Sequence, residues 1–348
     1  MKLHLVPAQF STTETLLLET SDFSIHAFTY STGVEALRIQ IGRGQFVWLP
    51  FFGQSLWSWK LDGVEQKFEG FVQEPDYAAR DFLHNYGAFM IHCGITAMGN
   101  PTKEDTHLHH GELPLARYKE AWIEISDGPY PISLCGKMQH RIPFIAAYEF
   151  APSLRILGDG TSVYVDSTLK NLQKTDLRYM YLNHLNFAMT QAVRLEYAMD
   201  QFTQDTVTVL DEVVPGVVAD PSLFLKVGNY PVYSPELVAI MKNQPQFGPV
   251  SVNKMYRSDG TVVWVAANTK ELDHTVAWLT KTPDRGACGF SLPATAGPRG
   301  LAEEGRQKNV KTLEAGNSVT FTYVFGLDKQ AENKKLQQAI ELLGGQYE

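Results

Sequence analysis

A polar stretch in the first third of the chain holds residue types that can do chemistry. The segment DTHLHHGELPLARY, residues 105–118, contains Asp105, His107, His109, His110 and Glu112 within eight positions. Imidazole and carboxylate groups bind metal ions and transfer protons near neutral pH. The stretch could therefore form a metal site, form an acid–base site for a small molecule, or be a solvated polar loop.

A metal site would use His107, His109 and Glu112. Residues separated by one position on a strand point to the same face, so both histidines could hold an ion and the glutamate could add a carboxylate. The gap between His109 and Glu112 is shorter than the one that cupin metal sites usually have. A metal-dependent sugar isomerase stays open as an alternative, but we expect neither a metal nor any other cofactor.

A small-molecule site would centre on His110. The glycine that follows it, Gly111, lets a ligand approach the backbone closely, and a histidine is a natural partner for a sugar hydroxyl or ring oxygen. If the segment is a strand, His107 and His109 face one way and His110 the other, so only one set faces a cleft without a bulge. We predict that His110 and Glu112 face the cleft.

The composition is that of an ordinary globular protein. Of the 348 residues, 44% are hydrophobic and 20% are charged, and the net charge is -8 with the basic residues scattered. No stretch approaches the roughly 20 apolar residues of a membrane span, and the first residues lack the apolar core of a secretory signal. We therefore expect a cytoplasmic protein without nucleic-acid or membrane partners, and the oligomeric state stays open.

The three cysteines, Cys93, Cys135 and Cys288, form no CxxC pair and are odd in number. We therefore expect free buried thiols rather than disulfides or a thiolate metal site.

Alternation of apolar and polar residues recurs along the chain and predicts strands. Examples are residues 37–41, 163–166, 193–197, 207–209, 262–266 and 319–325, separated by turn sequences such as GDG and SDG. One helix is predicted at residues 331–343, because Leu336, Ala339, Ile340 and Leu343 fall on one stripe that could pack on a sandwich. The proline-containing residues 214–250 read as a long excursion between strands. We predict a single all-β domain over residues 1–348.

Motifs along most of the chain resemble the galactose mutarotase-like family, the relatives of aldose 1-epimerases, in its uncharacterised branch (DUF4432-like). Residues 80–101 supply Gly87, Cys93-Gly94 and Gly99, residues 110–113 supply HGEL, and residues 183–187 supply NHLNF. Residues 289–300 (GFSLPATAGPRG) and 313–327 (LEAGNSVTFTYVFGL) continue the resemblance in the same order. The resemblance implies a β-supersandwich with a sugar-binding cleft on its concave face, and a small-molecule carbohydrate as the partner.

The resemblance also implies roles for individual residues. His184, within NHLNF, matches the histidine that donates a proton to the sugar ring oxygen, which makes it the predicted general acid. His110 and Arg80 match positions that hold sugar hydroxyls, and the neighbours His107, Asn183 and Asn186 are further candidates for substrate binding. The implied activity is mutarotation or epimerisation at the anomeric carbon of an aldose or a modified sugar.

The sequence departs from the family at the general base, because Leu292 stands where active epimerases have a glutamate. A displaced base could come from Glu112, Glu303 or Glu304, and we name Glu112 and Glu304 as catalytic candidates. A non-catalytic sugar-binding protein of the same fold is the main alternative. Trp57, Trp59, Trp264 and Trp278 could stack on a sugar or fill the core, and His274 is a polar candidate without a motif.

Overall fold

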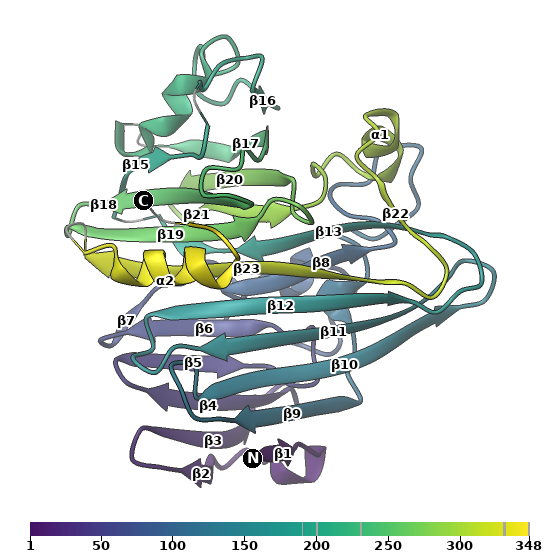
Figure 1. The fold of residues 1–348 in the computed structure, drawn as a ribbon, viewed down its shortest axis with the longest axis vertical. Helices are drawn as coiled ribbons and strands as arrows, with labels where there is room; N and C mark the ends of the chain where they lie inside the picture. The colour runs from purple at the N-terminus through teal and green to yellow at the C-terminus, as the bar shows by residue number, and fades with distance from the viewer. Residues whose placement is uncertain (190, 200, 230–231, 330–331, 347–348) are drawn as a thin grey trace.

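The computed structural model describes residues 1–189, 191–199, 201–229, 232–329 and 332–346. Within these residues the strands form two large antiparallel sheets that enclose a continuous apolar core running from Leu5 to Leu327 in sequence (Figure 1). The smaller sheet has the order β1 (Lys2–His4), β9 (Glu120–Ile125), β10 (Ile132–Ile142), β11 (Ala146–Ile156), β12 (Ser162–Asn171), β23 (Ser318–Lys329), β19 (Thr261–Asn268), β18 (Val250–Arg257) and β15 (Ala192–Glu196).

The larger sheet carries the features that matter for function. Its order is β16 (Val207–Val209), β17 (Tyr233–Lys242), β20 (His274–Thr282), β21 (Arg285–Ala294), β13 (Leu177–Leu185), β8 (Met90–Ile95), β6 (Leu56–Leu61), β5 (Gly44–Trp48), β4 (Glu35–Ile41), β3 (Phe23–Thr29) and β2 (Thr15–Glu19). Three short strands pair beside this path: β7 (Val64–Glu65), β14 (Phe187–Ala188) and β22 (Lys311–Leu313). The helices are α1 (Leu301–Arg306) and α2 (Lys334–Leu342), with 3-10 turns η1 (Pro7–Gln9), η2 (Leu83–Asn85), η3 (Leu113–Leu115), η4 (Pro221–Leu225) and η5 (Val227–Asn229).

The predicted all-β fold and its strands are confirmed. Leu37, Ile39 and Ile41 of β4 are fully buried while Gln40 between them is exposed, which is the alternation of a half-buried strand. Val193 is an exception, since a bulge in β15 between Ala192 and Arg194 turns it out to 47% exposure. The prediction of one domain over residues 1–348 stays a prediction, and the continuous core supports it.

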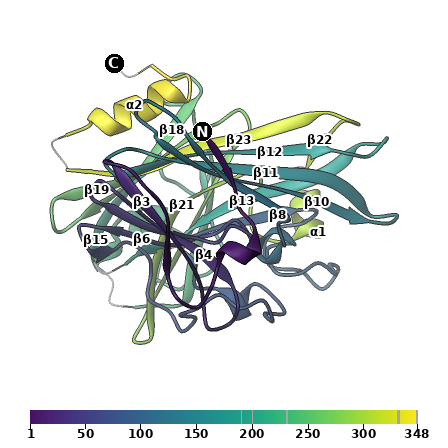
Figure 2. The same cartoon turned by 90° about the horizontal axis from the view of Figure 1, so that it is seen from below.

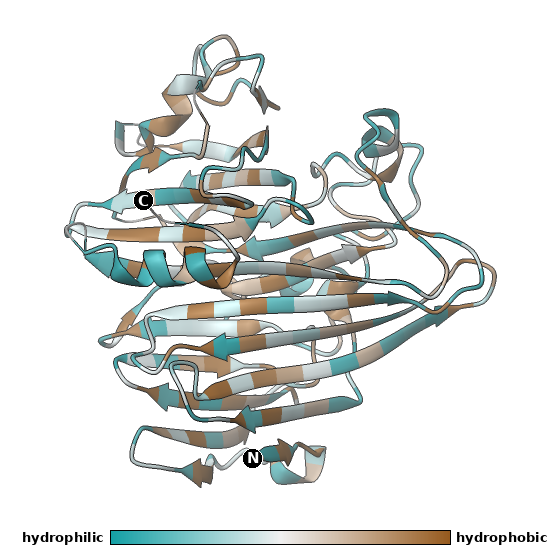
Figure 3. Cartoon of the chain, viewed as in Figure 1, coloured by the Kyte–Doolittle hydropathy of each residue, from teal (hydrophilic) through white to brown (hydrophobic). Residues whose placement is uncertain are grey.

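The predicted C-terminal helix is confirmed as α2, although residue 331 lies outside the described residues. Its apolar stripe packs on the outer face of the smaller sheet, with Leu336, Ala339, Ile340 and Leu343 joining Trp264 in one buried cluster. The polar face of α2 points outward (Figure 3), and the view turned by 90° shows the helix outside β18, β19 and β23 (Figure 2). No helix among the described residues is long and apolar enough to cross a membrane.

The reading of residues 214–250 as an excursion between strands is wrong in part, because strand β17 lies within it. The prolines that suggested a loop include Pro235, which the strand tolerates because the pairing with β20 is irregular between Tyr233 and Leu237.

Strand β13 separates two environments by the alternation of its side chains. Tyr181 and Asn183 face the smaller sheet: the Tyr181 ring stacks on Phe321 of β23, and Asn183 contacts His92. Leu182 and His184 face the other way and line a cavity on the outer face of the larger sheet. The alternation of β13 therefore decides which side chains of the NHLNF motif can meet a ligand.

Candidate functional site

A cavity of about 120 Å³ lies over β17, β20, β21 and β13 and is closed by loops from residues 82–86 and 98–110. We call it the histidine cavity. The residues that line it are Phe82, Leu83, Tyr86, Asn100, His109, His110, Leu182, His184, Leu210, Asp211, Glu236, Val238, Val276, Trp278, Leu292 and Pro298.

His184 is held in one orientation by Asn186. The amide nitrogen of Asn186 donates to the Ala88 carbonyl oxygen at 2.9 Å, which leaves Oδ1 of Asn186 to accept from His184 Nδ1 at 2.7 Å. The hydroxyl of Tyr86 donates to the same Oδ1 at 2.6 Å. Neutral His184 therefore carries its hydrogen on Nδ1 and a lone pair on Nε2.

His184 is 3% exposed, and burial lowers its pKa to about 3. An imidazolium would have to be desolvated in this environment without a carboxylate as its direct hydrogen-bond partner. The imidazole is therefore neutral at neutral pH.

His110 enters the cavity through an unusual backbone conformation. Its φ is +59° and that of Gly111 is +78°, and a Cβ at Gly111 would lie 2.3 Å from the Ala97 carbonyl oxygen. The His110 carbonyl accepts from Gly94 N at 2.9 Å, which ties this turn to β8. Because the segment is a turn and not a strand, His109 and His110 both line the cavity, and the expected alternation does not apply.

Burial also lowers the pKa of His110 to well below its ordinary value, and the nearby imidazoles of His184 and His109 add to the effect. Its Nδ1 atom is buried and has no hydrogen-bond partner among the described residues. An unpaired buried ring nitrogen in a cavity wall is a group that a polar ligand can satisfy.

Aromatic rings frame the two histidines. The ring of Trp278 lies 5.3 Å from that of His184, Tyr86 lies 5.5 Å from His184, and Phe82 lies 4.6 Å from His110, measured between centroids. Trp57, Trp59 and Trp264 are at most 2% exposed and fill the core, so Trp278 is the one of the four tryptophans proposed for stacking that lines the cavity.

A carboxylate that the sequence reading missed completes the cavity. Glu236 of β17 accepts a hydrogen bond from Trp278 Nε1 at 2.5 Å, so the indole bridges His184 on one side and Glu236 on the other. The available signal was the apolar run from Leu237 to Met241 directly after Glu236, but the flanking prolines made this run read as part of a loop. Leu292, which the motif resemblance matches to the glutamate of active epimerases, lies in the wall of the same cavity.

Glu112 is placed elsewhere. Its Oε1 accepts from Thr96 N at 3.0 Å and from the Tyr148 hydroxyl at 2.6 Å, and its Oε2 accepts from Thr96 Oγ1 at 2.8 Å. It lines a second cleft of about 640 Å³ beside the β10–β11 hairpin, which we call the hairpin cleft. The predicted pairing of His110 with Glu112 in one cleft is therefore not what the structure shows.

His107 also lines the hairpin cleft, and both of its ring nitrogens are engaged. Nδ1 donates to the Leu108 carbonyl at 2.8 Å, and Nε2 accepts from Leu301 N at 3.4 Å. These contacts anchor the loop to the start of α1. The described residues contain no group of three or more His, Cys, Asp or Glu side chains arranged to hold a metal ion, and His107 and Glu112 lie apart from His109.

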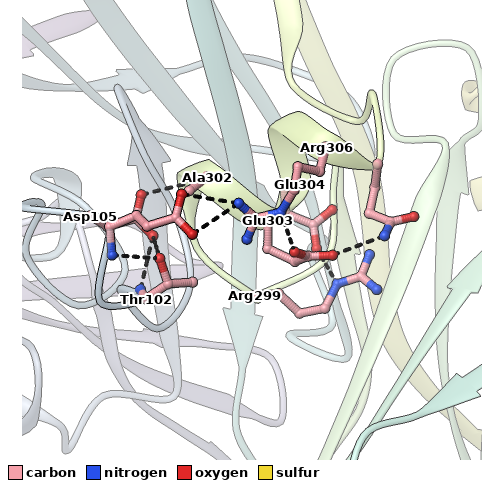
Figure 4. Close-up of polar contacts among 9 residues, drawn as sticks. Thr102, Asp105, Arg299, Ala302, Glu303, Glu304 and Arg306 are labelled. Carbon is pink, nitrogen blue, oxygen red and sulfur yellow. Dashed lines mark hydrogen bonds and ion pairs between the residues drawn. The ribbon is translucent and has the colours of Figure 1, made fainter.

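Glu304 is fully buried in α1 and does not line the histidine cavity. Figure 4 shows its carboxylate beside Arg299. Its carboxylate accepts from Arg299 Nε at 2.6 Å, from Asn309 Nδ2 at 2.6 Å and from Gly297 N at 3.1 Å. The neighbouring Glu303 pairs with Arg306 at 2.8 Å. Neither glutamate is placed to act as a base on a ligand beside His184.

The remaining candidates also divide by place. Asn183 is fully buried between the sheets with its amide nitrogen 3.3 Å from His92 Nδ1, and Arg80 is exposed and does not line the cavity. Asn186 lies beneath the cavity and orients His184. His274 lines a separate cleft, with its Nδ1 atom 2.8 Å from Asp273. The three cysteines are free and buried, as predicted.

Solved structures share this fold. A proposed aldose 1-epimerase from Klebsiella pneumoniae superposes with a TM-score of 0.80 at 17% identity, over 95% of this chain and 92% of that one. A galactose mutarotase-like protein from Clostridium acetobutylicum gives a TM-score of 0.62 at 12% identity, over 89% and 100% of the two chains. A galactose 1-epimerase from Lactobacillus acidophilus gives 0.55 at 12% identity, over 89% and 99%.

These likenesses confirm the predicted galactose mutarotase-like fold. No protein with a curated description is similar enough in sequence to count as a relative. Residues 31–327 match the family described as a domain of unknown function, DUF4432, and the chain therefore belongs to that family.

Proposed function

We propose that the histidine cavity binds a sugar and that the protein interconverts its anomers, the reaction of an aldose 1-epimerase. The observation that carries the proposal is the position of two groups on either side of Trp278: a buried neutral His184 with Nε2 unprotonated, and the carboxyl group of Glu236. The names of the proteins with the same fold agree with this class of reaction.

Anomer exchange needs one proton acceptor and one proton donor. The acceptor takes the proton of the anomeric hydroxyl, the C1–O5 bond breaks with its electron pair moving to the ring oxygen, and the donor protonates that oxygen. The C1–C2 bond then rotates, and reversal of the proton transfers closes the ring on the other face.

In the reactive form, the His184–Glu236 pair holds one proton. Because burial makes the imidazolium unfavourable, we assign His184 Nε2 as the acceptor and the carboxyl of Glu236 as the donor during ring opening. This reverses the acid role predicted for His184.

The other walls of the cavity fit a pyranose. The rings of Trp278 and Tyr86 offer apolar faces for its C–H bonds, and His109, His110, Asn100 and Asp211 offer polar atoms for its hydroxyls. A cytoplasmic location remains a prediction, supported by the three free thiols.

The test is anomer exchange followed by one-dimensional NMR on freshly dissolved sugars. We expect exchange above the uncatalysed rate, lowered about 10²- to 10⁴-fold in His184→Ala. The matched control is His4→Ala, an exposed histidine on β1 of the other sheet and outside the cavity, which should keep the wild-type rate. Exchange that is absent for every aldose in a broad panel would overturn the enzymatic proposal.

A sugar-binding protein without catalysis is the second candidate, and Leu292 favours it because an aliphatic residue occupies the family's glutamate position in the cavity wall. Thermal stabilisation by a sugar that undergoes no accelerated exchange would support this candidate over the first.

A further inference from the structure

One wall of the histidine cavity is aliphatic, and we call it the aliphatic wall. It consists of Leu182, Leu210, Val238, Val276 and Leu292. Four of these side chains come from β13, β17, β20 and β21, and Leu210 follows β16, so the wall runs across five consecutive strands of the larger sheet. Leu292 and Val276 lie directly opposite each other on paired strands.

The aliphatic wall offers a ligand no hydrogen bond. Leu182, Val276 and Leu292 are at most 2% exposed and Val238 is 6% exposed, so these side chains are almost completely shielded from water. Strand pairing occupies the backbone groups behind them: β20 pairs with both β17 and β21. A hydroxyl placed against this wall would lose its water partners and gain none.

Two polar groups share strands with the aliphatic wall. His184 is two residues from Leu182 on β13, and Glu236 is two residues from Val238 on β17, so each strand contributes one polar and one aliphatic residue to the same face. A ligand bound beside His184 and Glu236 therefore also lies against the aliphatic wall.

The charge of the cavity selects against anions. Among the described residues that line it there is no lysine or arginine, whereas Asp211 and Glu236 both contribute carboxylates. Burial lowers the pKa of each lining histidine, which keeps His109, His110 and His184 neutral at pH 7. A phosphorylated or oxidised sugar would find carboxylates and no cation to pair with.

We propose that the substrate is a neutral deoxy aldose, a sugar in which one carbon beyond the anomeric centre carries hydrogen in place of a hydroxyl and packs on the aliphatic wall. The inference rests on the proposed function, because it assumes that the anomeric end lies beside His184 and Glu236. The expected preference over the parent sugar is about 10- to 100-fold, the range over which an aliphatic pocket discriminates against an added hydroxyl.

The test compares sugars that differ at one position. D-Galactose is compared with 6-deoxy-D-galactose and D-galacturonate, D-mannose with 6-deoxy-D-mannose, and D-glucose with 2-deoxy-D-glucose, each for kcat/KM of anomer exchange by NMR and for Kd by calorimetry. We expect at least one deoxy sugar to exceed its parent by tenfold or more, and the uronate to be the poorest of its series.

Substitutions in the wall sharpen the test. Val276→Thr keeps the shape of the side chain and adds a hydroxyl, and it should reduce the preference for the deoxy sugar by about tenfold. Val238→Thr is a second wall variant in case the first is poorly folded. Val193→Thr, at an exposed position outside the cavity, is the matched control and should leave the preference unchanged.

The outcomes separate this inference from the proposed function. Accelerated exchange with equal kcat/KM for parent and deoxy sugars would overturn the deoxy preference and leave the epimerase proposal standing. A third outcome is that no sugar shows accelerated exchange but a deoxy sugar binds more tightly than its parent, and Val276→Thr weakens this binding. That outcome would overturn the proposed catalysis and support the proposed preference for a deoxy sugar. Equal or absent binding across every pair would overturn the inference, as would a preference for galacturonate.

Discussion

The histidine cavity and the hairpin cleft each contain histidines and a glutamate, but they use them differently. In the hairpin cleft, Glu112 accepts three hydrogen bonds from the protein and His107 uses both ring nitrogens within the chain. In the histidine cavity, His184 presents Nε2 to the cavity and His110 has an unpaired Nδ1. The polar stretch 105–118 contributes to both places.

The difference shows why residue type does not identify a site. A carboxylate whose lone pairs are taken by backbone and side-chain donors stabilises a loop, and it has little capacity left for a substrate. A buried neutral imidazole with one nitrogen open to a cavity lowers the stability of the fold, but this nitrogen can accept a proton from a ligand. The hydrogen-bond partners therefore separate the structural residues from the candidates for function.

The largest effect that we expect is a loss of stability at acid pH, caused by buried histidines. The folded-state pKa of His184 and that of His92 are each about 3, below the ordinary value of 6.5, so the unfolded chain binds their protons first. Stability is then fully present above pH 6.5 and falls as the pH drops towards 3. Each histidine contributes up to about 1.4 kcal/mol per pH unit once the pH is well below 6.5, so His184 and His92 together should contribute about 3 kcal/mol between pH 6.5 and 5.

Urea unfolding across this pH range measures the effect. His184→Gln should remove about a third of the loss, because glutamine does not titrate while His92 and His110 still do. A free energy of unfolding that is flat from pH 7 to 5 would contradict the burial of neutral histidines in the folded state.

The next prediction concerns Glu304, a carboxylate whose hydrogen-bond partners all come from the protein. Glu304→Gln removes the buried charge that faces Arg299 and should lower the free energy of unfolding by about 3 kcal/mol, as the loss of one partner of a buried ion pair does. Anomer exchange per folded molecule should be unchanged, since Glu304 does not line the histidine cavity. Loss of anomer exchange in a Glu304→Gln sample that circular dichroism shows to be folded would contradict the purely structural role of Glu304.

A smaller effect is expected at Tyr86, which donates to the Asn186 oxygen that orients His184. Tyr86→Phe keeps the ring and removes one hydrogen bond, so stability should fall by about 1 kcal/mol. The exchange rate should fall by about threefold to tenfold in kcat, with KM little changed, because the imidazole is less firmly positioned. A change in KM alone would indicate a sugar contact in place of a positioning role.

Much of the fold could be predicted from the sequence, because period-two alternation and the stripe of α2 are local signals. The motif resemblance singled out His184 and His110, and both line the cavity, although their roles stay predictions. Glu236 could not be predicted, since its approach to His184 depends on β17, β20, β21 and β13 lying side by side. The hydrogen bonds that occupy Glu112 and Glu304 come from Tyr148 and Arg299, respectively. Sequence spacing does not show that these side chains meet.

The most direct test of the account substitutes Glu236 and Glu112 by glutamine in two separate variants. Anomer exchange at pH 7 is measured by NMR for Glu236→Gln and for Glu112→Gln, with a sugar that the wild type accepts. We expect Glu236→Gln to lose about 10²-fold or more in kcat, while Glu112→Gln keeps wild-type exchange and loses stability through its contacts with Thr96 and Tyr148. Full exchange in Glu236→Gln, with loss of exchange in folded Glu112→Gln, would place the chemistry at the hairpin cleft and contradict the account.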